Sequence, residues 1–393
     1  MSIRSSSSGA GRHQADVASS ADEQWMARAL VLASRSAALA HPNPAVGAVL
    51  VKNGRAIAEG FHQYDHFDHA EVVALKKAGA KARGATLYVT LEPCCTTGRT
   101  GPCTSAVIDA GVKRVVVAMQ DPNPAVAGRG FAQIRRAGIK VVSGIGENEA
   151  QRINEGFAKW IRTGLPFVTL KTALTLDGQI ASLKGSTTWI TSEASREAVQ
   201  RLRHESDALL TGIGPVLSDN PRMSDRSGRP RHRPLMRAIV DSHLRMPLKS
   251  ELVKSAQRDV IVYTIQPHHS AKARALERAG IDVVRMPART GRVDLQTVLR
   301  DLGNRQILNV ILEAGAELNG AALEAGIVDK MVLFYAPKIM GAGGVPMASI
   351  STSSFAKSPA LQNLRLFPCG ADFVVEGYFN DYVHRHHRTR RKN

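Results

Sequence analysis

The sequence predicts an α/β protein with two domains. Its 393 residues are enough for two domains of ordinary size, and apolar residues make up 44% of the chain. Strand and helix candidates alternate along both halves, which is typical of α/β sheets. A change in composition at residues 160–166, which include Gly164-Leu165-Pro166, marks the boundary between the two series.

The first series follows a leader of residues 1–23, which is rich in Ser, Ala and Gly and is expected to be disordered. An organellar transit peptide is the alternative interpretation of this leader. Residues 24–39 have the pattern of an amphipathic helix, which Pro42 and Pro44 prevent from continuing. Asn53-Gly54 predicts a hairpin turn. The domain spans residues 24–164; its other expected elements are strands at 46–51, 56–60, 85–91 and 112–118 and helices at 69–77 and 104–110.

The second series spans residues 165–380 and is richer in strands. Six apolar runs predict strands, three amphipathic runs predict helices, and residues 371–379 are expected to close the sheet as a late strand. The strand candidates are 167–174, 208–211, 235–241, 260–264, 307–313 and 331–337, and the helix candidates are 193–205, 295–302 and 317–325.

Charge and cysteine usage restrict the class of protein. The net charge of +18 favours anionic ligands, and residues 381–393 form a basic tail that is interpreted as a solvated end. No apolar run reaches the ~18 residues of a membrane span, so no membrane partner is expected. Three of the four cysteines cluster at positions 94, 95 and 103, which favours a metal or reactive site and a reducing, cytoplasmic compartment. Cys369 stands alone and is expected to be a core thiol.

The first candidate site combines one histidine with two cysteines. His69 opens a predicted helix, Cys94 follows a predicted strand, and Cys103 precedes another helix. One imidazole and two thiolates are three of the four ligands of tetrahedral zinc, and a catalytic site leaves the fourth position for water. Glu71 is placed to move a proton from that water to a leaving amine. The His-x-Glu and Pro-Cys pattern is typical of zinc deaminases, in which the Glu is not a ligand.

Other interpretations of these residues stay open. Eight residues separate Cys94 from Cys103, unlike the common Pro-Cys-x-x-Cys, and Cys95 is a rival ligand. Neighbouring residues on a turn rarely both reach one metal, which favours Cys103. Without a metal, His69 would cap a helix and the cysteines would be core residues. A closed structural zinc site is the third alternative, and it lacks a fourth protein ligand.

The motifs of the first half resemble the deaminase half of the bifunctional riboflavin-biosynthesis deaminase–reductase family. They are Pro42-Asn43-Pro44, His69-Ala70-Glu71, Leu91-Glu92-Pro93-Cys94, the stretch Gly98-Arg99-Thr100-Gly101-Pro102-Cys103, Asp121-Pro122-Asn123-Pro124 and Gly128-Arg129-Gly130.

The resemblance implies a cytidine-deaminase-like αβα domain with one zinc ion per chain. It implies that His69, Cys94 and Cys103 bind the zinc, that Glu71 is the catalytic proton shuttle, and that Asn43 lines the substrate pocket. The substrate would be a diaminopyrimidinone carrying ribose 5-phosphate, which loses its ring 2-amino group. The chain departs from the family at Tyr64 to Asp68 and at Cys95-Thr96, and these departures bear on how the substrate is held.

The second half carries weaker motifs. Gly212-Ile213-Gly214 is an incomplete dinucleotide fingerprint because position 217 is Leu, and Gly315 follows an apolar strand at the start of a helix. Its longer motifs resemble the reductase half of the same family. They are Leu170 to Ala181, Trp189-Ile190-Thr191, Asp207 to Gly212, Asp219-Asn220-Pro221, Glu313-Ala314-Gly315 and Ala336-Pro337-Lys338.

This resemblance implies a dihydrofolate-reductase-like α/β domain that uses NADPH and passes hydride to C1 of the ribosylamino group. It implies cofactor contacts at Ala173, Trp189, Asp219, Gly315, Ala316, Glu317, Leu318, Asn319, Gly320 and Ala321. It implies substrate contacts at Thr187, Arg203, Met223, Arg226 and Glu313. The forked guanidinium groups of Arg203 and Arg226 suit the 5-phosphate. Pro215 stands where the family has Thr, and Met223 where Leu is common.

The sequence therefore predicts a bifunctional zinc deaminase and NADPH-dependent reductase of riboflavin biosynthesis. Its partners would be small pyrimidine ribotides, nucleic acid is not expected, and a homo-oligomer stays open. The rival functions are a polynucleotide-editing deaminase, which would leave the second half unexplained, and a zinc-stabilised scaffold without catalysis, for which Glu71 would be dispensable.

Overall fold

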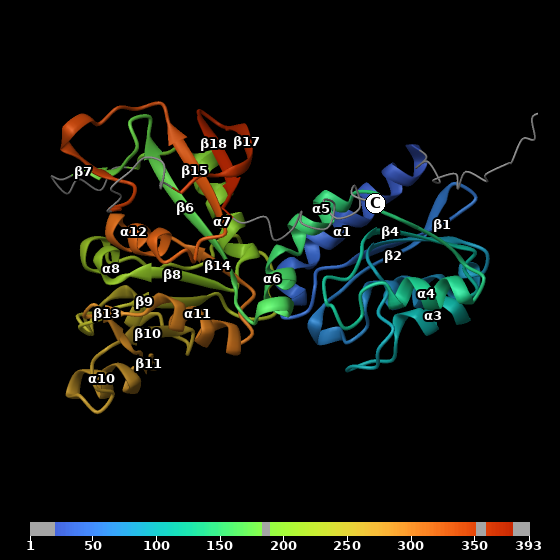
Figure 1. Cartoon of the computed structure of the whole chain (residues 1–393), viewed down its shortest axis with the longest axis horizontal. Coiled ribbons are helices and arrows are strands. Elements are labelled where there is room, and N and C mark those ends of the chain that lie inside the picture. The colour runs from blue at the N-terminus through green and yellow to red at the C-terminus, as the bar shows by residue number, and fades with distance from the viewer. Residues whose placement is uncertain (1–19, 183–188, 351–358, 380–393) are drawn as a thin grey trace, which may run out of the picture.

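The computed structural model describes residues 20–182, 189–350 and 359–379. Within these ranges the chain forms two lobes, each built around its own sheet (Figure 1). The first helix already begins at Ser20, so the expected disordered leader ends too late at residue 23. The predicted tail, residues 381–393, lies outside the described residues.

The first lobe contains a five-stranded sheet in the order β2-β1-β3-β4-β5. β1 pairs antiparallel with β2 and β3, whereas β3, β4 and β5 run parallel. The strands are β1 (Gly47–Lys52), β2 (Arg55–Phe61), β3 (Thr86–Leu91), β4 (Arg114–Met119) and β5 (Lys140–Ser143). The helical segments are α1 (Ser20–Ala40), η1 (Tyr64–His66), α2 (Ala70–Ala78), η2 (Gly79–Ala82), α3 (Cys103–Asp109), α4 (Arg129–Arg136), α5 (Glu147–Ile153) and α6 (Glu155–Thr163).

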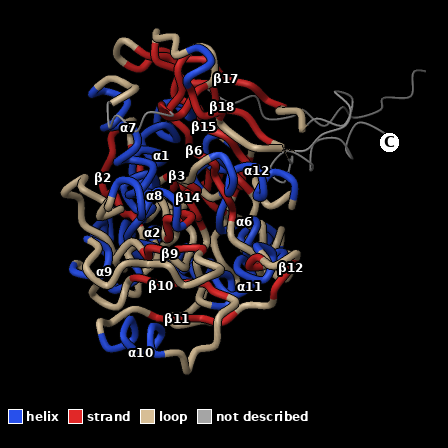
Figure 2. The backbone as a smooth tube through the Cα atoms, turned by 90° about the vertical axis from the view of Figure 1, so that its left-hand side faces the viewer, coloured by secondary structure: helices blue, strands red, loops and turns tan. Residues whose placement is uncertain are grey.

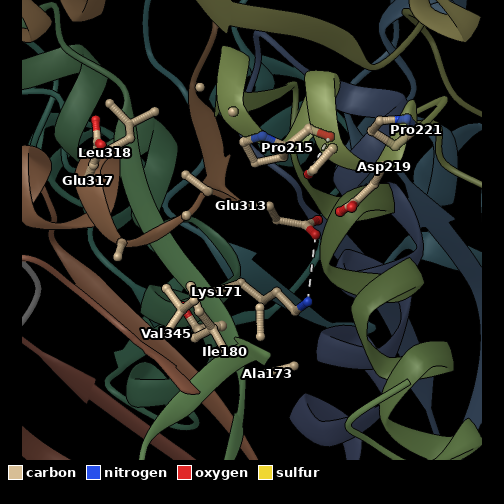
Figure 3. Close-up of a pocket in the computed structure, with 18 of the residues that line it drawn as sticks. Lys171, Ala173, Ile180, Pro215, Asp219, Pro221, Glu313, Glu317, Leu318 and Val345 are labelled. Carbon is tan, nitrogen blue, oxygen red and sulfur yellow. Dashed lines mark hydrogen bonds and ion pairs between the residues drawn. The ribbon is translucent and has the colours of Figure 1, made fainter. Parts of the chain in front are cut away.

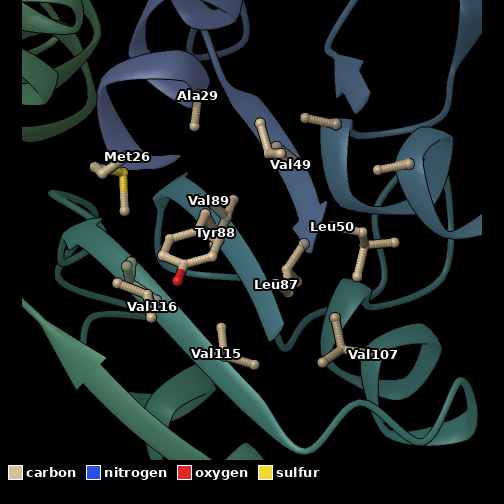
Figure 4. Packing of buried hydrophobic residues seen from close by; sticks show 14 of the residues in the cluster. Met26, Ala29, Val49, Leu50, Leu87, Tyr88, Val89, Val107, Val115 and Val116 are labelled. Atoms are coloured by element: carbon tan, nitrogen blue, oxygen red, sulfur yellow. The ribbon is translucent and has the colours of Figure 1, made fainter. Parts of the chain in front are cut away.

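Helices pack closely on this sheet because the facing residues are apolar or small. Figure 4 shows Met26 and Ala29 of α1 beside Val49 of β1 and Val116 of β4. A Cβ atom at Gly47 would lie 2.1 Å from the carbonyl oxygen of Ala29, so only glycine permits this approach of β1 to α1. Gly60 of β2 approaches α2 in the same way, because a Cβ atom there would lie 2.3 Å from the carbonyl oxygen of Ala70. The start of α2, where the first candidate site lies, is thus held against the sheet.

The second lobe contains a nine-stranded sheet in the order β11-β10-β9-β8-β14-β6-β15-β18-β17. The strands from β11 to β15 run parallel, and β18 and β17 are added antiparallel at one edge. The strands of this sheet are β6 (Phe167–Thr175), β8 (Ala208–Gly212), β9 (Met236–Val240), β10 (Val260–Thr264), β11 (Asp282–Arg285), β14 (Asn309–Leu312), β15 (Lys330–Ala336), β17 (Gln362–Cys369) and β18 (Asp372–Tyr378).

Helices and two small ribbons complete this lobe, and Figure 2 shows α10 beside the edge strand β11. The helical segments are α7 (Glu193–Glu205), α8 (Ile213–Asp219), α9 (Glu251–Lys254), α10 (Ala271–Arg278), α11 (Leu295–Asn304), α12 (Ala316–Glu324) and η3 (Gly341–Gly343). The ribbons pair β7 (Gln179–Ser182) with β16 (Gly344–Pro346) and β12 (Ala288–Arg289) with β13 (Arg292–Val293). In the described part of the chain, no helix has both the length and the hydropathy to cross a membrane.

Helix α6 lies between the lobes and packs against the second one (Figure 1). Lys159 donates to Asp329 at 2.6 Å in an ion pair whose two side chains are 6% and 2% exposed. The indole nitrogen of Trp160 donates to the carbonyl of Gly303 at 2.9 Å. The chain then turns at Gly164, where φ is +72°, and enters β6. The turn lies at the boundary that the sequence predicts, although α6 contacts both lobes.

Candidate active sites

Three side chains from separate elements meet at one end of the first sheet. His69 caps the start of α2, Cys94 lies after β3, and Cys103 is the first residue of α3. Nδ1 of His69 lies 3.1 Å from Sγ of Cys103 and 3.5 Å from Sγ of Cys94. Among the described residues, this is the one cluster of His, Cys, Asp or Glu suited to a metal ion, and Cys95 is not part of it.

The spacing of these atoms fits zinc. Bonds of about 2.0–2.3 Å in a tetrahedron separate the ligand atoms by about 3.3–3.8 Å. The two nitrogen–sulfur separations are 3.1 and 3.5 Å, and all three ligand atoms lie within 4.8 Å of one another. An imidazole and two thiolates are also the donors that zinc prefers. The residues present therefore suit a zinc ion with its fourth position open.

The surroundings of these side chains shift their pKa values in different directions. A hydrogen bond from the Cys103 thiol, with help from His69 and the backbone N–H of Cys103, lowers the pKa of Cys94 to about 4. Donation to Cys94, together with burial, raises the pKa of Cys103. Glu71 is 3% exposed, and its burial raises the pKa of its carboxyl to about 7. Such a carboxyl can both take and release a proton near neutral pH.

His62 also belongs to this site, and the sequence analysis did not select it. Its ring meets that of His69 edge to face with 5.0 Å between centroids. Nδ1 lies 3.0 Å from the carbonyl of Asp68, so it carries the proton, and Nε2 accepts from the side-chain amide of Asn43 at 3.0 Å. Burial lowers the pKa of His62 to about 4, so the ring is neutral. Its signal in the sequence is a histidine directly after β2.

The loop that carries Cys94 is held from behind. The buried carboxylate of Glu92 accepts the backbone N–H groups of Gly128 at 2.9 Å and Phe131 at 3.1 Å. A Cβ atom at Gly130 would lie 2.2 Å from the carbonyl oxygen of Pro93, so glycine is required there. These contacts explain two motifs of the first half as supports of the metal-binding loop.

The second lobe contains a cavity of about 1700 Å³ beside the ends of β6, β8 and β14. This volume exceeds the roughly 300–1,000 Å³ of a pocket for one small ligand, so it can hold two. Figure 3 shows Lys171, Ala173, Asp219 and Glu313 facing it. The predicted residues that line it are Ala173, Trp189, Asp219, Gly315, Ala316, Glu317, Leu318 and Ala321 of the cofactor set and Arg203, Met223, Arg226 and Glu313 of the substrate set.

A buried ionic cluster stands in this cavity. Both nitrogens of the Arg203 fork donate to the carboxylate of Glu313, at 2.7 and 3.0 Å, and Nζ of Lys171 lies 3.6 Å from the same group. Burial opposes ionisation of Glu313, yet the two cations lower its pKa to about 2. Burial lowers the pKa of Lys171. The Arg203 fork is thus engaged by Glu313 rather than open for a phosphate, and Lys171 is a site residue that sequence analysis missed.

Two predicted residues of this site are placed differently, and a third cannot be placed. Thr187 lies outside the described residues. The side-chain amide of Asn319 donates to the carbonyl of Met347 at 2.8 Å, and a Cβ atom at Gly320 would lie 1.9 Å from the carbonyl oxygen of Ser349. Asn319 and Gly320 therefore contact the segment after β16 and do not line the cavity. Pro215, one of the departures from the family, does line it.

The start of α12 suits the phosphates of a dinucleotide. Gly315 precedes the helix in extended conformation, with φ −83° and ψ 176°, and a Cβ atom there would meet no neighbour within 4 Å. The free backbone N–H groups of the first turn can therefore approach an anion from the cavity. The cavity and this helix start together fit a nicotinamide dinucleotide.

Comparisons with known proteins place each half of the chain in a family. Residues 19–119 match the family described as cytidine and deoxycytidylate deaminase zinc-binding region, and residues 166–375 match the RibD C-terminal domain. The chain is 40% identical over 361 residues to the riboflavin biosynthesis protein RibD of Aquifex aeolicus, covering 92% of this chain and 99% of that protein. It is 45% identical over 327 residues to RibD of Escherichia coli, covering 81% and 89%.

Solved structures show the same similarity in three dimensions. RibD of Acinetobacter baumannii superposes with a TM-score of 0.80 at 37% identity, covering 91% of this chain and 98% of that chain. A diaminohydroxyphosphoribosylaminopyrimidine deaminase/5-amino-6-(5-phosphoribosylamino)uracil reductase of Thermotoga maritima superposes with a TM-score of 0.79 at 34% identity, with the same coverage.

Proposed function

The chain belongs to the RibD family of riboflavin-biosynthesis proteins, and from that premise we propose which of its residues carry each reaction. It is a bifunctional enzyme, a hydrolytic deaminase and an oxidoreductase, that acts on small pyrimidine ribotides. Zinc serves the deaminase half and NADPH the reductase half. The assignment of the deaminase to residues up to 164 and of the reductase to 165–380 rests on the turn at Gly164.

For deamination, we assign the zinc site to His69, Cys94 and Cys103. Bound there, zinc supplies an acidified water for hydrolysis of the ring 2-amino group. The carboxylate of Glu71 would take a proton from the attacking water as its oxygen bonds to ring C2, and would give it to the amine, so that the C2–N bond breaks and ammonia leaves. The support is the position of Glu71, buried in the first turn of α2 and two residues from His69, with a pKa of about 7.

His62 and Asn43 are proposed to orient the pyrimidinone. The neutral His62 ring presents Nε2 toward Asn43, and Asn43 follows α1 in the loop that faces this ring. A hydrogen bond to a neutral heterocycle needs such uncharged donors and acceptors, because an unpaired buried charge would be costly. Arg99, on the loop between the two cysteines, is proposed as the cation for the substrate phosphate.

For reduction, the lining of the large cavity is divided between cofactor and substrate. We assign Gly315, Ala316, Glu317, Leu318 and Ala321, with Ala173, Trp189 and Asp219, to NADPH, whose phosphates would meet the start of α12. Asn319 and Gly320 are assigned to the packing of that helix. The substrate set is Arg203, Met223, Arg226 and Glu313, with Lys171 added, and Thr187 by resemblance alone.

The contacts within the ionic cluster decide which of its residues is assigned to which part of the substrate. Because Arg203 is bound to Glu313, the 5-phosphate is assigned to Arg226, whose side chain lines the cavity. Glu313 and Lys171 are left to hold the sugar hydroxyls. NADPH would supply the hydride for C1 of the ribosylamino group, and the ring oxygen that leaves C1 would take a proton from water, which gives the ribityl chain. The low pKa of Glu313 keeps its carboxylate ionised, and an ionised acceptor forms charge-assisted hydrogen bonds with such hydroxyls.

This proposal rests on two separate sites in one chain of the RibD family. One is a His-Cys-Cys cluster that suits zinc, and the other is a cavity large enough for a dinucleotide and a substrate. The test supplies the diaminopyrimidinone ribotide with and without NADPH and follows ammonia release and NADPH oxidation. We expect ammonia in both cases and NADPH oxidation only after deamination. Absence of ammonia release, with zinc bound, would refute the assignment of the first site.

Two finer features are also proposed. A cytoplasmic location is supported by the four free thiols, which suit a reducing compartment. A homo-oligomer is supported by the exposed apolar side chains of the edge strand β17, of which Leu364 is 60% and Leu366 68% exposed. Sedimentation equilibrium distinguishes a monomer from an oligomer, and Leu366→Glu should weaken an oligomer built on this strand.

A further inference from the structure

One residue of the second lobe reaches the loop that borders the deaminase site. His232 lies between α8 and β9, and its Nδ1 lies 2.8 Å from a carboxylate oxygen of Asp65. Its ring packs on the ring of Tyr64, with 4.5 Å between centroids and 39° between planes. Its backbone N–H donates to the carbonyl of Ala38 at the end of α1 at 2.9 Å. The His232 side chain is 14% exposed and is thus largely covered by the first lobe.

The partners of His232 in turn hold Arg99. The Arg99 guanidinium carbon lies 4.0 Å from the centroid of the Tyr64 ring and 4.3 Å from that of Phe67. One guanidinium nitrogen donates to the carbonyl of Tyr64 at 3.2 Å. Contacts of a guanidinium with two aromatic faces restrict where its charge can lie. We call Tyr64, Phe67, His232 and Arg99 the arginine clamp.

The position of Arg99 connects the clamp with the chemistry. Arg99 is on the short loop between Cys94 and Cys103, and its partner Phe67 directly precedes Asp68, whose carbonyl accepts from Nδ1 of His62 at 3.0 Å. His62 itself contacts the ring of His69. The guanidinium therefore stands within electrostatic reach of the deaminase site, where a substrate with an anionic phosphate would approach.

His232 is held rigidly from its own side. The neighbouring Arg231 donates to the carbonyls of His204 at 2.9 Å and Ser206 at 2.6 Å and to the carboxylate of Asp225 at 3.0 Å. These bonds fix the segment that carries His232 to the end of α7. The second lobe thus offers a fixed support, whereas the stretch Tyr64 to Asp68 is a short turn on the surface of the first lobe.

We propose that His232, a residue of the reductase half, is a positioning residue of the deaminase reaction. It steadies Tyr64 and Asp65, and through them it holds the Arg99 guanidinium where the substrate phosphate binds. The deaminase affinity for the phosphorylated substrate then depends on a side chain of the other domain, while zinc binding and proton transfer do not. This inference rests on the proposed function of the first site.

The test compares the full-length chain with its His232→Ala variant. We expect the deaminase KM for the diaminopyrimidinone ribotide to rise by on the order of fivefold, as for loss of a partly exposed ring and ion-pair contact. The deaminase kcat, the zinc content and the reductase constants for the deaminated ribotide should stay at wild-type values. His232→Phe keeps a ring against Tyr64, so its KM should be close to the wild-type value. His268→Ala, at an exposed position before α10, is the matched control.

Two further experiments test whether His232 changes the KM through Arg99. Arg99→Ala should raise the KM more than His232→Ala, and the double variant should match Arg99→Ala alone, because His232 acts through Arg99. With the dephosphorylated nucleoside as substrate, wild type and His232→Ala should have equal KM values. An unchanged KM for the ribotide in His232→Ala would overturn the inference, as would parallel loss of zinc or of reductase activity. Failure of the wild-type chain to deaminate would instead refute the proposed function.

Discussion

The two sites differ in how their residues are distributed along the chain. The metal cluster uses His69 and Cys103, at the starts of α2 and α3, and Cys94, in the loop after β3. The reductase cavity is lined from Lys171 to Val345 and draws on strand ends, helix starts and a ribbon. Two helix starts and one loop can fix three ligand atoms, whereas a cavity for two ligands needs the whole sheet edge. Substitution of one metal ligand should therefore abolish deamination, whereas substitution of one residue of the cavity should lower the reductase activity only in part.

The largest effect is expected from the thiolate ligands. Cys94→Ser or Cys103→Ser should remove the zinc and abolish deamination, because in each variant a hydroxyl group replaces one of the three protein ligands. Cys95→Ser should keep one zinc per chain. Metal analysis of purified protein checks this difference. Retention of zinc in Cys103→Ser together with its loss in Cys95→Ser would show that the ligand set is wrong.

A graded effect is expected in the ionic cluster of the second site. Glu313→Gln removes the carboxylate between Arg203 and Lys171 and leaves two buried cations uncompensated, at a cost of about 3 kcal/mol. The reductase kcat/KM should fall on the order of 10²-fold, because the amide cannot form the charge-assisted hydrogen bonds of the carboxylate in the site. Deamination should be unaffected. Steady-state kinetics measure both, with the exposed Glu277→Gln as control. A decrease in deamination of the same size would contradict the separation of the sites.

A smaller effect is expected in cofactor choice. From the resemblance to the family, the reductase should prefer NADPH to NADH by at least about tenfold in kcat/KM. Charge-assisted hydrogen bonds to the extra phosphate are the physical source of such a preference. The comparison requires the deaminated ribotide as substrate at saturating concentration. Equal kcat/KM values for the two cofactors would show that the reductase has no preference for NADPH, but they would not contradict the position of the dinucleotide site.

The sequence predicts the first site better than the second for a physical reason. Metal ligands must be His or Cys at short range, so their types and order already restrict the geometry. The fork of Arg203 was expected to hold a phosphate, but its partner in the fold is Glu313, and no local pattern reports a partner 110 residues away. Asn319 belonged to the expected cofactor stretch, yet its side chain bonds the segment after β16.

The fold shows the same limit. Long apolar strands such as β6 and β15 are found where the sequence predicts them. The short β5, with sequence Lys-Val-Val-Ser, and the arginine-rich α4 were missed because few of their residues are buried and apolar. His232 could not be selected at all, because its contacts are with the other lobe. Periodicity identifies elements that bury a face and does not identify contacts between domains.

The central claim is that one chain carries two separate active sites. Glu71→Gln tests it most directly, because the change keeps the size and hydrogen bonding of the side chain and removes the proton shuttle. Zinc should stay bound, deamination should fall on the order of 10²-fold or more, and the deaminated ribotide should be reduced at the wild-type rate. Loss of that reduction, or survival of deamination, would contradict the account.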